Sequence, residues 1–263
     1  MHTRMRERRR WVAWERGRRR MAVLLAVALL AAAVAGVLWL RSSHVFAVER
    51  VLLPKTQHVS EDDIRAALGD TSQADLMTVD PEALELKLAA IPYVRTAHVY
   101  RRFPHTLEVT VDEYRAAGRI QGVDGRVWLV SDDGRVLEPL RPGTPVLGSE
   151  GLLLLKSPEA LSLEPGSALP REVAAVLALG PLLKKDAAWW SSHRVHHVEL
   201  RSSGEATVIL GSGLEIRLGD TSQLDQKLMV AKTIIEQYLR KGEAPAYVDV
   251  HDPSWAVAKP KGP

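Results

Sequence analysis

The longest uninterrupted run of apolar residues lies near the start of the chain, at Met21–Leu40. An α-helix of this length, rising about 1.5 Å per residue, spans roughly 30 Å, which is the thickness of the hydrocarbon core of a bilayer. Arginines crowd residues 1–20, whereas only Arg41 lies close on the other side. Because positively charged flanks stay in the cytoplasm, the pattern predicts one transmembrane helix, a basic cytoplasmic tail and an exported remainder.

A second interpretation of this region is a cleaved signal peptide. Ala33-Val34-Ala35 resembles the small-residue motif at which such peptides are cut. The long basic region, and the apolar residues that continue to Leu40 after this motif, favour an uncleaved anchor.

Beyond residue 40 the apolar positions recur with the periods of strands and helices. Val45–Leu53 is rich in β-branched and aromatic residues and predicts a strand. Helices are predicted to begin at Ser60, which precedes three acidic residues, and at Asp80-Pro81. Apolar residues then alternate over 97–103, with Ala97, Val99 and Phe103 inward, and over 107–111. The order predicted for 41–117 is β-α-α-β-β.

From residue 118 the pattern predicts a second domain that ends near residue 259, followed by a short stub, 260–263. Asp124-Gly125 and Asp133-Gly134 are strong hairpin signals. Strands are predicted at 123–130, 136–140, 195–200, 206–210 and 214–218, with a last hairpin formed by 246–250 and 255–258, and 152–155 is a short apolar run. Helices are predicted from Pro170, broken at Gly180-Pro181, and from a Ser222 cap to Lys241-Gly242. The fold class is therefore α+β, with a mixed and mostly antiparallel C-terminal domain.

Charge changes the picture once it is divided along the chain. The formal net charge of +3 and the pI near 9.2 invite a nucleic-acid interpretation. However, residues 41–263 hold 26 of the 35 basic and 30 of the 32 acidic residues, so the exported part is mildly acidic. It also lacks an aromatic stripe among its basic residues, so we expect no nucleic-acid binding. The basicity belongs to the predicted cytoplasmic tail.

The residues that could perform chemistry are few. The sequence contains neither a phosphate-binding glycine loop nor a G-x-S-x-G motif. His193, His196 and His197 would suit a metal on a helix, but the valines around them predict a strand, on which His193 and His197 share one face. No carboxylate or cysteine nearby completes a site. We expect no catalytic, cofactor or metal site, and an exported metal-dependent enzyme built on these histidines is the remote alternative.

Ordered motifs identify a resemblance to a known family. The first half contains Phe46-Ala47-Val48-Glu49-Arg50-Val51, Leu88-Ala89-Ala90-Ile91-Pro92-Tyr93-Val94, Arg102-Phe103-Pro104-His105-Thr106-Leu107 and Val109-Thr110-Val111-Asp112-Glu113. The second half contains Asp124-Gly125-Arg126-Val127, Pro145-Val146-Leu147-Gly148, Leu214-Glu215-Ile216-Arg217-Leu218-Gly219 and Tyr247-Val248-Asp249-Val250. In their order and spacing they resemble the FtsQ/DivIB family of bacterial cell division proteins.

The resemblance implies a POTRA domain at 41–117 and an FtsQ-type β domain at 118–259. It also implies a non-enzymatic scaffold of the divisome, a single-pass protein of the inner membrane whose C-terminal domains are periplasmic and gather at the division septum. The implied partners are the coiled-coil pair FtsB and FtsL and other divisome membrane proteins of the FtsK, FtsW and FtsI type. No cofactor, nucleic acid or small-molecule substrate is implied.

In the family, FtsB adds a strand to the edge of the β domain, which is a common mode of peptide recognition. The resemblance places this edge at Tyr247–His251, with Trp255–Ala258 as the neighbouring arm. The implied partner-binding residues are Ala246, Tyr247, Val248, Asp249, Val250, His251, Trp255 and Ala256. The alternative is that Tyr247, Val248 and Val250 are simply core residues of a terminal hairpin. Where the family usually has V-D-L-R-Y, this chain has His251 and Asp252 in place of the last two residues.

A different class of POTRA protein is the other alternative. A POTRA-bearing translocation or secretion component needs an amphipathic barrel of many alternating strands. Residues 118–263 are too few for such a barrel, and their pattern includes helices.

Overall fold

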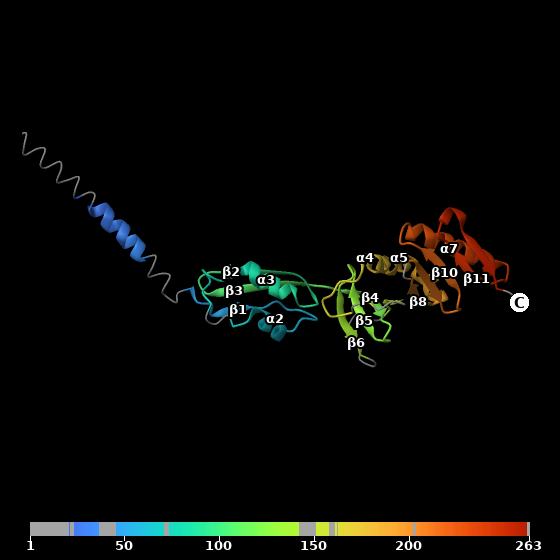
Figure 1. Cartoon of the computed structure of the whole chain (residues 1–263), viewed down its shortest axis with the longest axis horizontal. Helices are drawn as coiled ribbons and strands as arrows, with labels where there is room; N and C mark the ends of the chain where they lie inside the picture. Colours follow the sequence, from blue (N-terminus) through green and yellow to red (C-terminus); the bar gives the residue numbers. More distant parts are fainter. Residues whose placement is uncertain are drawn as a thin grey trace, which may run out of the picture. The chain divides into compact units, whose positions relative to one another are not determined.

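The structure is a computed structural model of the chain (Figure 1). It describes residues 21, 24–36, 46–70, 74–141, 151–157, 161, 163–201 and 204–261. The predicted basic tail and parts of the predicted membrane span lie outside these ranges. Residues 24–36 form a helix with exposed side chains. Within the described ranges, no helix combines the length and the apolar character needed to cross a membrane. The membrane anchor therefore stays a prediction.

Contacts divide the chain into two compact units. The described core of the first unit comes from 46–53, 69–70, 74–81 and 99–109. A three-stranded sheet has the order β1-β3-β2, formed by β1 (Arg50–Leu52), β3 (Thr106–Glu113) and β2 (Val94–Arg102). The strands β1 and β3 are parallel, with Arg50 opposite Thr106 and Leu52 opposite Glu108. The buried side chains of this unit are Val48, Leu76, Val99, Leu107 and Val109.

The β-α-α-β-β order is confirmed, and its helices begin where cap chemistry places them. In α2 (Glu61–Leu68) the Ser60 hydroxyl accepts the N–H of Asp63 at 3.0 Å, and the Asp63 carboxylate accepts from Ser60 in return. The next helix, α3 (Pro81–Ala89), has its proline at the first position, as predicted. β1 is shorter than predicted, since only Arg50–Leu52 is paired as a strand.

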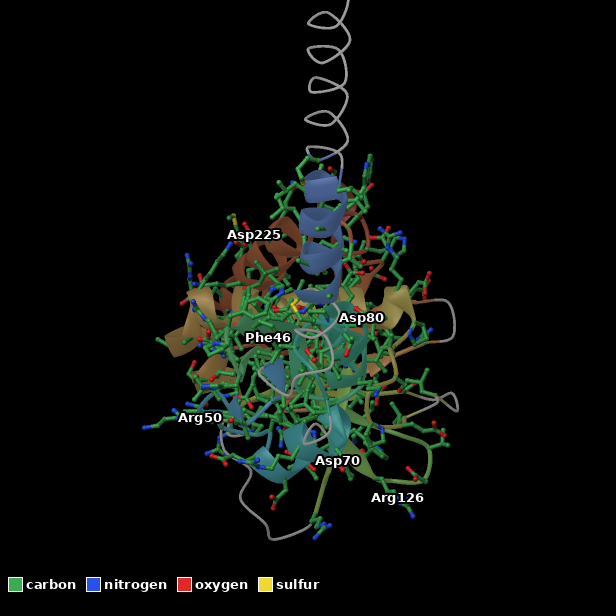
Figure 2. The ribbon with its side chains drawn as sticks, turned by 90° about the vertical axis from the view of Figure 1, so that its left-hand side faces the viewer. Phe46, Arg50, Asp70, Asp80, Arg126 and Asp225 are labelled. Atoms are coloured by element: carbon green, nitrogen blue, oxygen red, sulfur yellow. The ribbon has the colours of Figure 1, made fainter. Side chains whose placement is uncertain are left out.

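Phe103 differs from the sequence prediction, which placed it inward. Its side chain is 56% exposed, and its ring meets the ring of Phe46 edge-on at a centroid distance of 5.8 Å. Figure 2 shows the side chain of Phe46 beside the ribbon of this unit. The alternation along β2 therefore ends at Val99, before the turn that leads to β3.

The carboxylate of Glu113 holds a turn through three backbone N–H groups. It accepts from Gln57 at 2.7 Å and from His58 and Val59 at 2.8 Å each. Burial opposes ionisation, but these hydrogen bonds and the nearby His58 outweigh it and lower the pKa of Glu113. This glutamate closes the Val109–Glu113 motif, and its role in the structure is to fix the approach to α2.

Glu113→Gln should lower the free energy of unfolding by about 2 kcal/mol at pH 7, because a charged acceptor of three N–H groups is replaced by a neutral one. The depressed pKa means that the stabilisation is complete above the unfolded pKa, about 4.3, and is lost as pH falls through the folded value. Urea unfolding at pH 7 and pH 3 measures both effects, and the difference from the unmodified protein should shrink at pH 3. Asp112→Asn, at the neighbouring position, is the control. An equal loss in both variants would contradict the assignment.

The second unit contains a nine-stranded sheet of order β12-β11-β10-β9-β8-β7-β4-β5-β6. Its strands are β4 (Ala116–Gln121), β5 (Val127–Ser131), β6 (Val136–Leu140), β7 (Leu153–Lys156), β8 (Val195–Leu200), β9 (Ala206–Leu210), β10 (Glu215–Gly219), β11 (Pro245–Asp249) and β12 (Val257–Pro260). Three neighbouring pairs are parallel (β4–β7, β7–β8 and β10–β11) and the others are antiparallel. The mixed, mostly antiparallel domain is confirmed. β4 was not predicted as a strand, and β5 begins later than expected. Arg126 lies in the turn between these two strands, and its side chain points outward (Figure 2).

The helical segment after Pro170 runs on past its predicted break. It consists of α4 (Arg171–Ala175), the 3-10 turn Val176–Ala178, α5 (Leu179–Lys185) and α6 (Ala187–His193). Gly180-Pro181 lies inside the first turn of α5, where a proline costs no intrahelical hydrogen bond because the N–H groups there have no partner within the helix. The predicted break is therefore wrong.

The long helix α7 (Leu224–Arg240) packs against β10 and β11 (Figure 1). Ser222 is not its N-cap, since its hydroxyl bonds to the Asp220 carboxylate and Gln223 is the capping residue, with φ +50°. Leu228, Ala231 and Ile235 of α7 join the main hydrophobic core. Tyr238 of the same helix is only partly buried.

Hydrogen bonds also tie the segment after α3 to the β5–β6 hairpin. The Arg135 guanidinium donates to the carbonyl oxygens of Ala89 at 2.9 Å and Pro92 at 3.1 Å. The Tyr93 hydroxyl donates to Glu138 at 2.5 Å, and burial followed by this bond raises the pKa of Tyr93. Because Tyr93 stays protonated, it remains a donor across the neutral pH range.

Candidate partner-binding edge

The C-terminal hairpin forms as predicted, but the edge of the sheet is its second arm. β11 pairs on both sides, in parallel with β10 and antiparallel to β12. The strand order ends at β12, Val257–Pro260. The prediction that Tyr247–His251 is the edge is therefore wrong, because β10 and β12 cover both sides of that strand.

Hydrogen-bond directions show which backbone groups of β12 face outward. The N–H of Val250 donates to Arg217 of β10 at 2.9 Å, so Val248 also faces β10, whereas Tyr247 and Asp249 face β12. Their partners, Lys259 and Val257, face back toward β11. By alternation the N–H and C=O of Ala258 point away from the sheet, and Pro260 has no N–H. The Tyr238 hydroxyl of α7 donates to the Ala258 carbonyl oxygen at 3.4 Å, so the Ala258 N–H is the outward group left for a partner. Ala258 is therefore the only residue of β12 that offers an outward donor.

The predicted partner-binding residues divide into buried and exposed groups. Val248 and Val250 are fully buried in the hydrophobic core, which agrees with the core alternative. Tyr247 is half-buried, and the Arg217 guanidinium lies 4.1 Å from its ring centroid. Trp255 is 82% exposed and the neighbouring Val257 58% exposed. A charge at Val248 or a proline at Val250 would disrupt the core, so neither substitution reports on binding alone.

The remaining predicted residues surround this hairpin. Ala246 and Asp249 are partly buried on β11, and Ala256 packs against the core between Trp255 and Val257. Asp252 accepts the N–H of Ser254 at 2.8 Å and starts the 3-10 turn Pro253–Trp255. This turn presents Trp255 beside the free edge.

His251 lies over Gly219, at the end of β10. Gly219 has φ +67°, and a Cβ added there would lie 1.9 Å from the His251 Nδ1 atom. The close approach and the left-handed backbone both require glycine at this position. His251 is exposed and, with Arg201, Arg217 and Asp249, lines a hollow of about 200 Å³.

Gly219→Ala should therefore lower the free energy of unfolding by about 2 kcal/mol, from the backbone conformation and the displaced imidazole together. Combining it with His251→Ala removes the clash and leaves about 1 kcal/mol of backbone cost. Thermal unfolding of the single and double variants measures the difference. An equal cost with and without His251 would show that the ring does not rest on Gly219.

The three candidate histidines are separated by secondary structure. His193 ends α6 rather than beginning a strand, and its ring stacks on Trp189 at 4.0 Å, which corrects the predicted shared face with His197. On β8, His196 and His197 contact each other through their Nδ1 atoms at 2.6 Å, and His197 Nε2 contacts Glu199 at 3.2 Å. Across the described ranges no group of three or more His, Cys, Asp or Glu residues is arranged to hold a metal ion.

Comparison with known proteins gives this edge its context. Two family models match the chain: the FtsQ-type POTRA domain over residues 46–114, and the C-terminal domain of cell division protein FtsQ/DivIB over residues 118–251. The chain belongs to the FtsQ/DivIB family of cell division proteins. The family resemblance inferred from the sequence motifs is thereby confirmed.

Relatives named cell division protein FtsQ support the same assignment. The one from Myxococcus fulvus is 26% identical over 231 residues, which covers 86% of this chain and 78% of the relative. The one from Burkholderia pseudomallei is 32% identical over 116 residues, 44% of this chain and 45% of the relative. The one from Bordetella pertussis is 35% identical over 98 residues, 35% of each. The chain thus spans about half or less of two of these relatives.

Two residues of the edge strand β12, Val257 and Ala258, are absent from the partner-binding residues predicted from the sequence. The signal that could have found them is Lys259-Pro260, since a lysine and a proline in a short terminal strand are typical of an exposed edge.

Proposed function

We propose that this protein is a non-enzymatic divisome scaffold that holds the FtsB–FtsL pair on the outer edge of β12. The observation that supports this most strongly is the outward N–H of Ala258, flanked by the exposed apolar side chains of Trp255 and Val257. An incoming strand can accept a hydrogen bond from this N–H and cover the apolar surface, as in other cases of strand addition.

The wider arrangement belongs to the same proposal. The Met21–Leu40 segment anchors the protein in the inner membrane with its N-terminus in the cytoplasm and its POTRA domain, 41–117, and β domain, 118–259, in the periplasm. There the protein links early septal components to late ones, and its other partners are divisome membrane proteins of the FtsK, FtsW and FtsI type. Membership of a cell division family and the strong charge asymmetry around the apolar run support this arrangement.

The direct test is localisation in dividing cells. A fluorescent fusion of the full chain, replacing the native copy, should form a band at midcell. A uniform membrane signal in cells that still divide would overturn the septal role. In the same cells, recovery of FtsB and FtsL with the fusion should be lost when the chain ends before Asp252, whereas unchanged recovery would overturn the assignment of β12.

A further inference from the structure

A second hollow lies in the same unit, separated from β12 by β9, β10 and β11 in the strand order. Its volume is about 430 Å³, within the range of ligand-binding cavities. Residues of strands β4, β7 and β8 and of helices α5 and α6 line it. The described pairing of β7 with β8 covers only Leu155–Val198 and Lys156–Glu199, and the earlier residues of both strands line the cavity instead.

The described lining of the cavity contains cationic side chains and no acidic one. Arg119, Lys184 and Arg194 line it, and its described lining contains no Asp or Glu. Arg119 donates to the Leu152 carbonyl oxygen at 2.8 and 3.1 Å, which leaves its charge unneutralised. Among the described residues Lys184 and Arg194 form no ion pair, whereas Lys185 pairs with Asp225 at 3.2 Å. Three positively charged residues therefore line a space that no described carboxylate lines.

The lining of the cavity is also partly apolar. Trp190 and Leu183 line it with buried side chains, and Trp190 meets Trp189 edge-on at 4.6 Å. The combination of cations with an apolar surface suits a ligand that has a carboxylate next to an aliphatic side chain.

Arg194 occupies a backbone conformation that an arginine disfavours. It ends α6 with φ +51°, the left-handed conformation that glycine or asparagine usually supplies at this position. Its carbonyl oxygen accepts the Gly211 N–H at 2.6 Å, which a glycine in its place could do equally well. A side chain kept at a strained position on the wall of a cavity is a feature of functional sites.

We propose that this cavity binds an acidic peptide segment of a partner protein. A carboxylate lies between Arg194 and Lys184, and the adjoining apolar side chain packs on Trp190 and Leu183. The main-chain groups at the diverging starts of β7 and β8 favour a peptide, which can form hydrogen bonds with them, over a small inorganic anion. The choice of a protein partner rests on the proposed scaffold function.

The test uses the full chain in nanodiscs and two fluorescein-labelled pentapeptides, Gly-Glu-Leu-Asp-Gly and its amide counterpart Gly-Gln-Leu-Asn-Gly. By fluorescence anisotropy the acidic peptide should bind at least about tenfold more tightly than the amide, and Arg194→Gly or Lys184→Met should remove about that factor. Lys185→Met, one residue from the cavity lining, is the matched control and should bind normally. Equal binding of the two peptides, or normal binding by Arg194→Gly, would overturn the proposal.

Competition and melting measurements distinguish a peptide site from an anion site, a lipid site and a structural cap. Displacement of the peptide by inorganic phosphate at an equal concentration, or binding only to nanodiscs with anionic lipid, would also overturn the peptide assignment.

Arg194→Gly and Arg194→Asn should have melting temperatures no lower than that of the unmodified protein, with a gain of about 2 °C for glycine. A fall of several degrees in both variants would instead show that Arg194 is a structural helix cap and would overturn its role in binding. FtsB–FtsL binding, measured in parallel, should persist in Arg194→Gly; its absence from the unmodified protein would count against the scaffold function alone.

Discussion

Asp220→Ala should lower the free energy of unfolding by about 3 kcal/mol, because it leaves the buried ammonium of Lys227 without its carboxylate. The Lys227 side chain is only 1% exposed, and its Nζ donates to the Asp220 carboxylate at 2.6 Å and to the Asp220 carbonyl oxygen at 3.0 Å. Asp220 itself is 67% exposed. The bond from Lys227, followed by those from Ser222, lowers the pKa of Asp220 well below its usual range, so Asp220 is ionised at neutral pH.

The partner substitution should behave differently although it removes the same ion pair. Lys227→Met removes the buried charge, keeps a side chain of similar length, and leaves behind an aspartate that water can solvate, so we expect a loss of at most about 1 kcal/mol. Asp220→Ala combined with Lys227→Met should be close to Lys227→Met alone, since no unpaired ammonium remains. Asp220→Asn keeps an acceptor without the charge and should fall between the two single variants.

Urea unfolding of the four variants at pH 7 measures this asymmetry. Equal losses for Asp220→Ala and Lys227→Met would contradict the view that the buried cation, rather than the pair, determines the cost. The lowered pKa also fixes the pH dependence: the contribution of Asp220 is complete above its unfolded pKa, about 3.9, and is lost as pH falls through the folded value. Lys227→Met should therefore lose less stability than the unmodified protein when the pH is lowered to 3.

The elements that the sequence predicts well are those whose ends are set by local chemistry. α2 begins at the reciprocal Ser60–Asp63 bonds and α3 at Asp80-Pro81, and neither depends on distant parts of the chain. The strands β8, β9 and β10 follow from apolar runs separated by Gly-containing turns, because those turns allow only short hairpins.

The elements that the sequence does not predict depend on tertiary partners. β4 has no clear alternation, and it becomes a strand because it lies between β5 and β7, where Gly118 allows close packing of Leu177. The Gly180-Pro181 pair looks like a break, but the preceding 3-10 turn moves it to the start of a new helix, where a proline is tolerated. The His193 prediction failed for a related reason, since α6 continues to that residue.

In the candidate site, too, some features follow from local chemistry and others depend on tertiary partners. The turn chemistry of Asp252-Pro253 predicts the terminal hairpin, but it cannot say which arm is paired on its outer side. That depends on the crossover through α7, which returns the chain parallel to β10 and makes β11 an inner strand. Strand order is a property of the whole sheet, so a local sequence pattern does not determine which strand lies at the edge.

Ala258→Pro should strongly weaken the proposed binding of the FtsB–FtsL pair while leaving the fold intact. The N–H of Ala258 points away from β11, so its loss removes no hydrogen bond within the sheet, and a proline is tolerated at such an edge position. An added strand, in contrast, loses the single outward donor of β12 and meets the proline ring. We expect the affinity to fall at least about 100-fold, with the melting temperature changed by less than about 3 °C.

Two matched variants make the result specific to the outward N–H. Ala258→Val keeps the donor and raises strand propensity, so it should bind within about threefold of the unmodified protein. Lys259→Pro removes an N–H that faces β11, so it should lower the melting temperature as well as binding. Affinity is measured with the full chain in nanodiscs and the purified FtsB–FtsL pair, and melting is followed by circular dichroism. If Ala258→Pro binds normally while Lys259→Pro does not, the partner approaches a surface other than the free edge, because only a strand added at β12 requires the Ala258 donor.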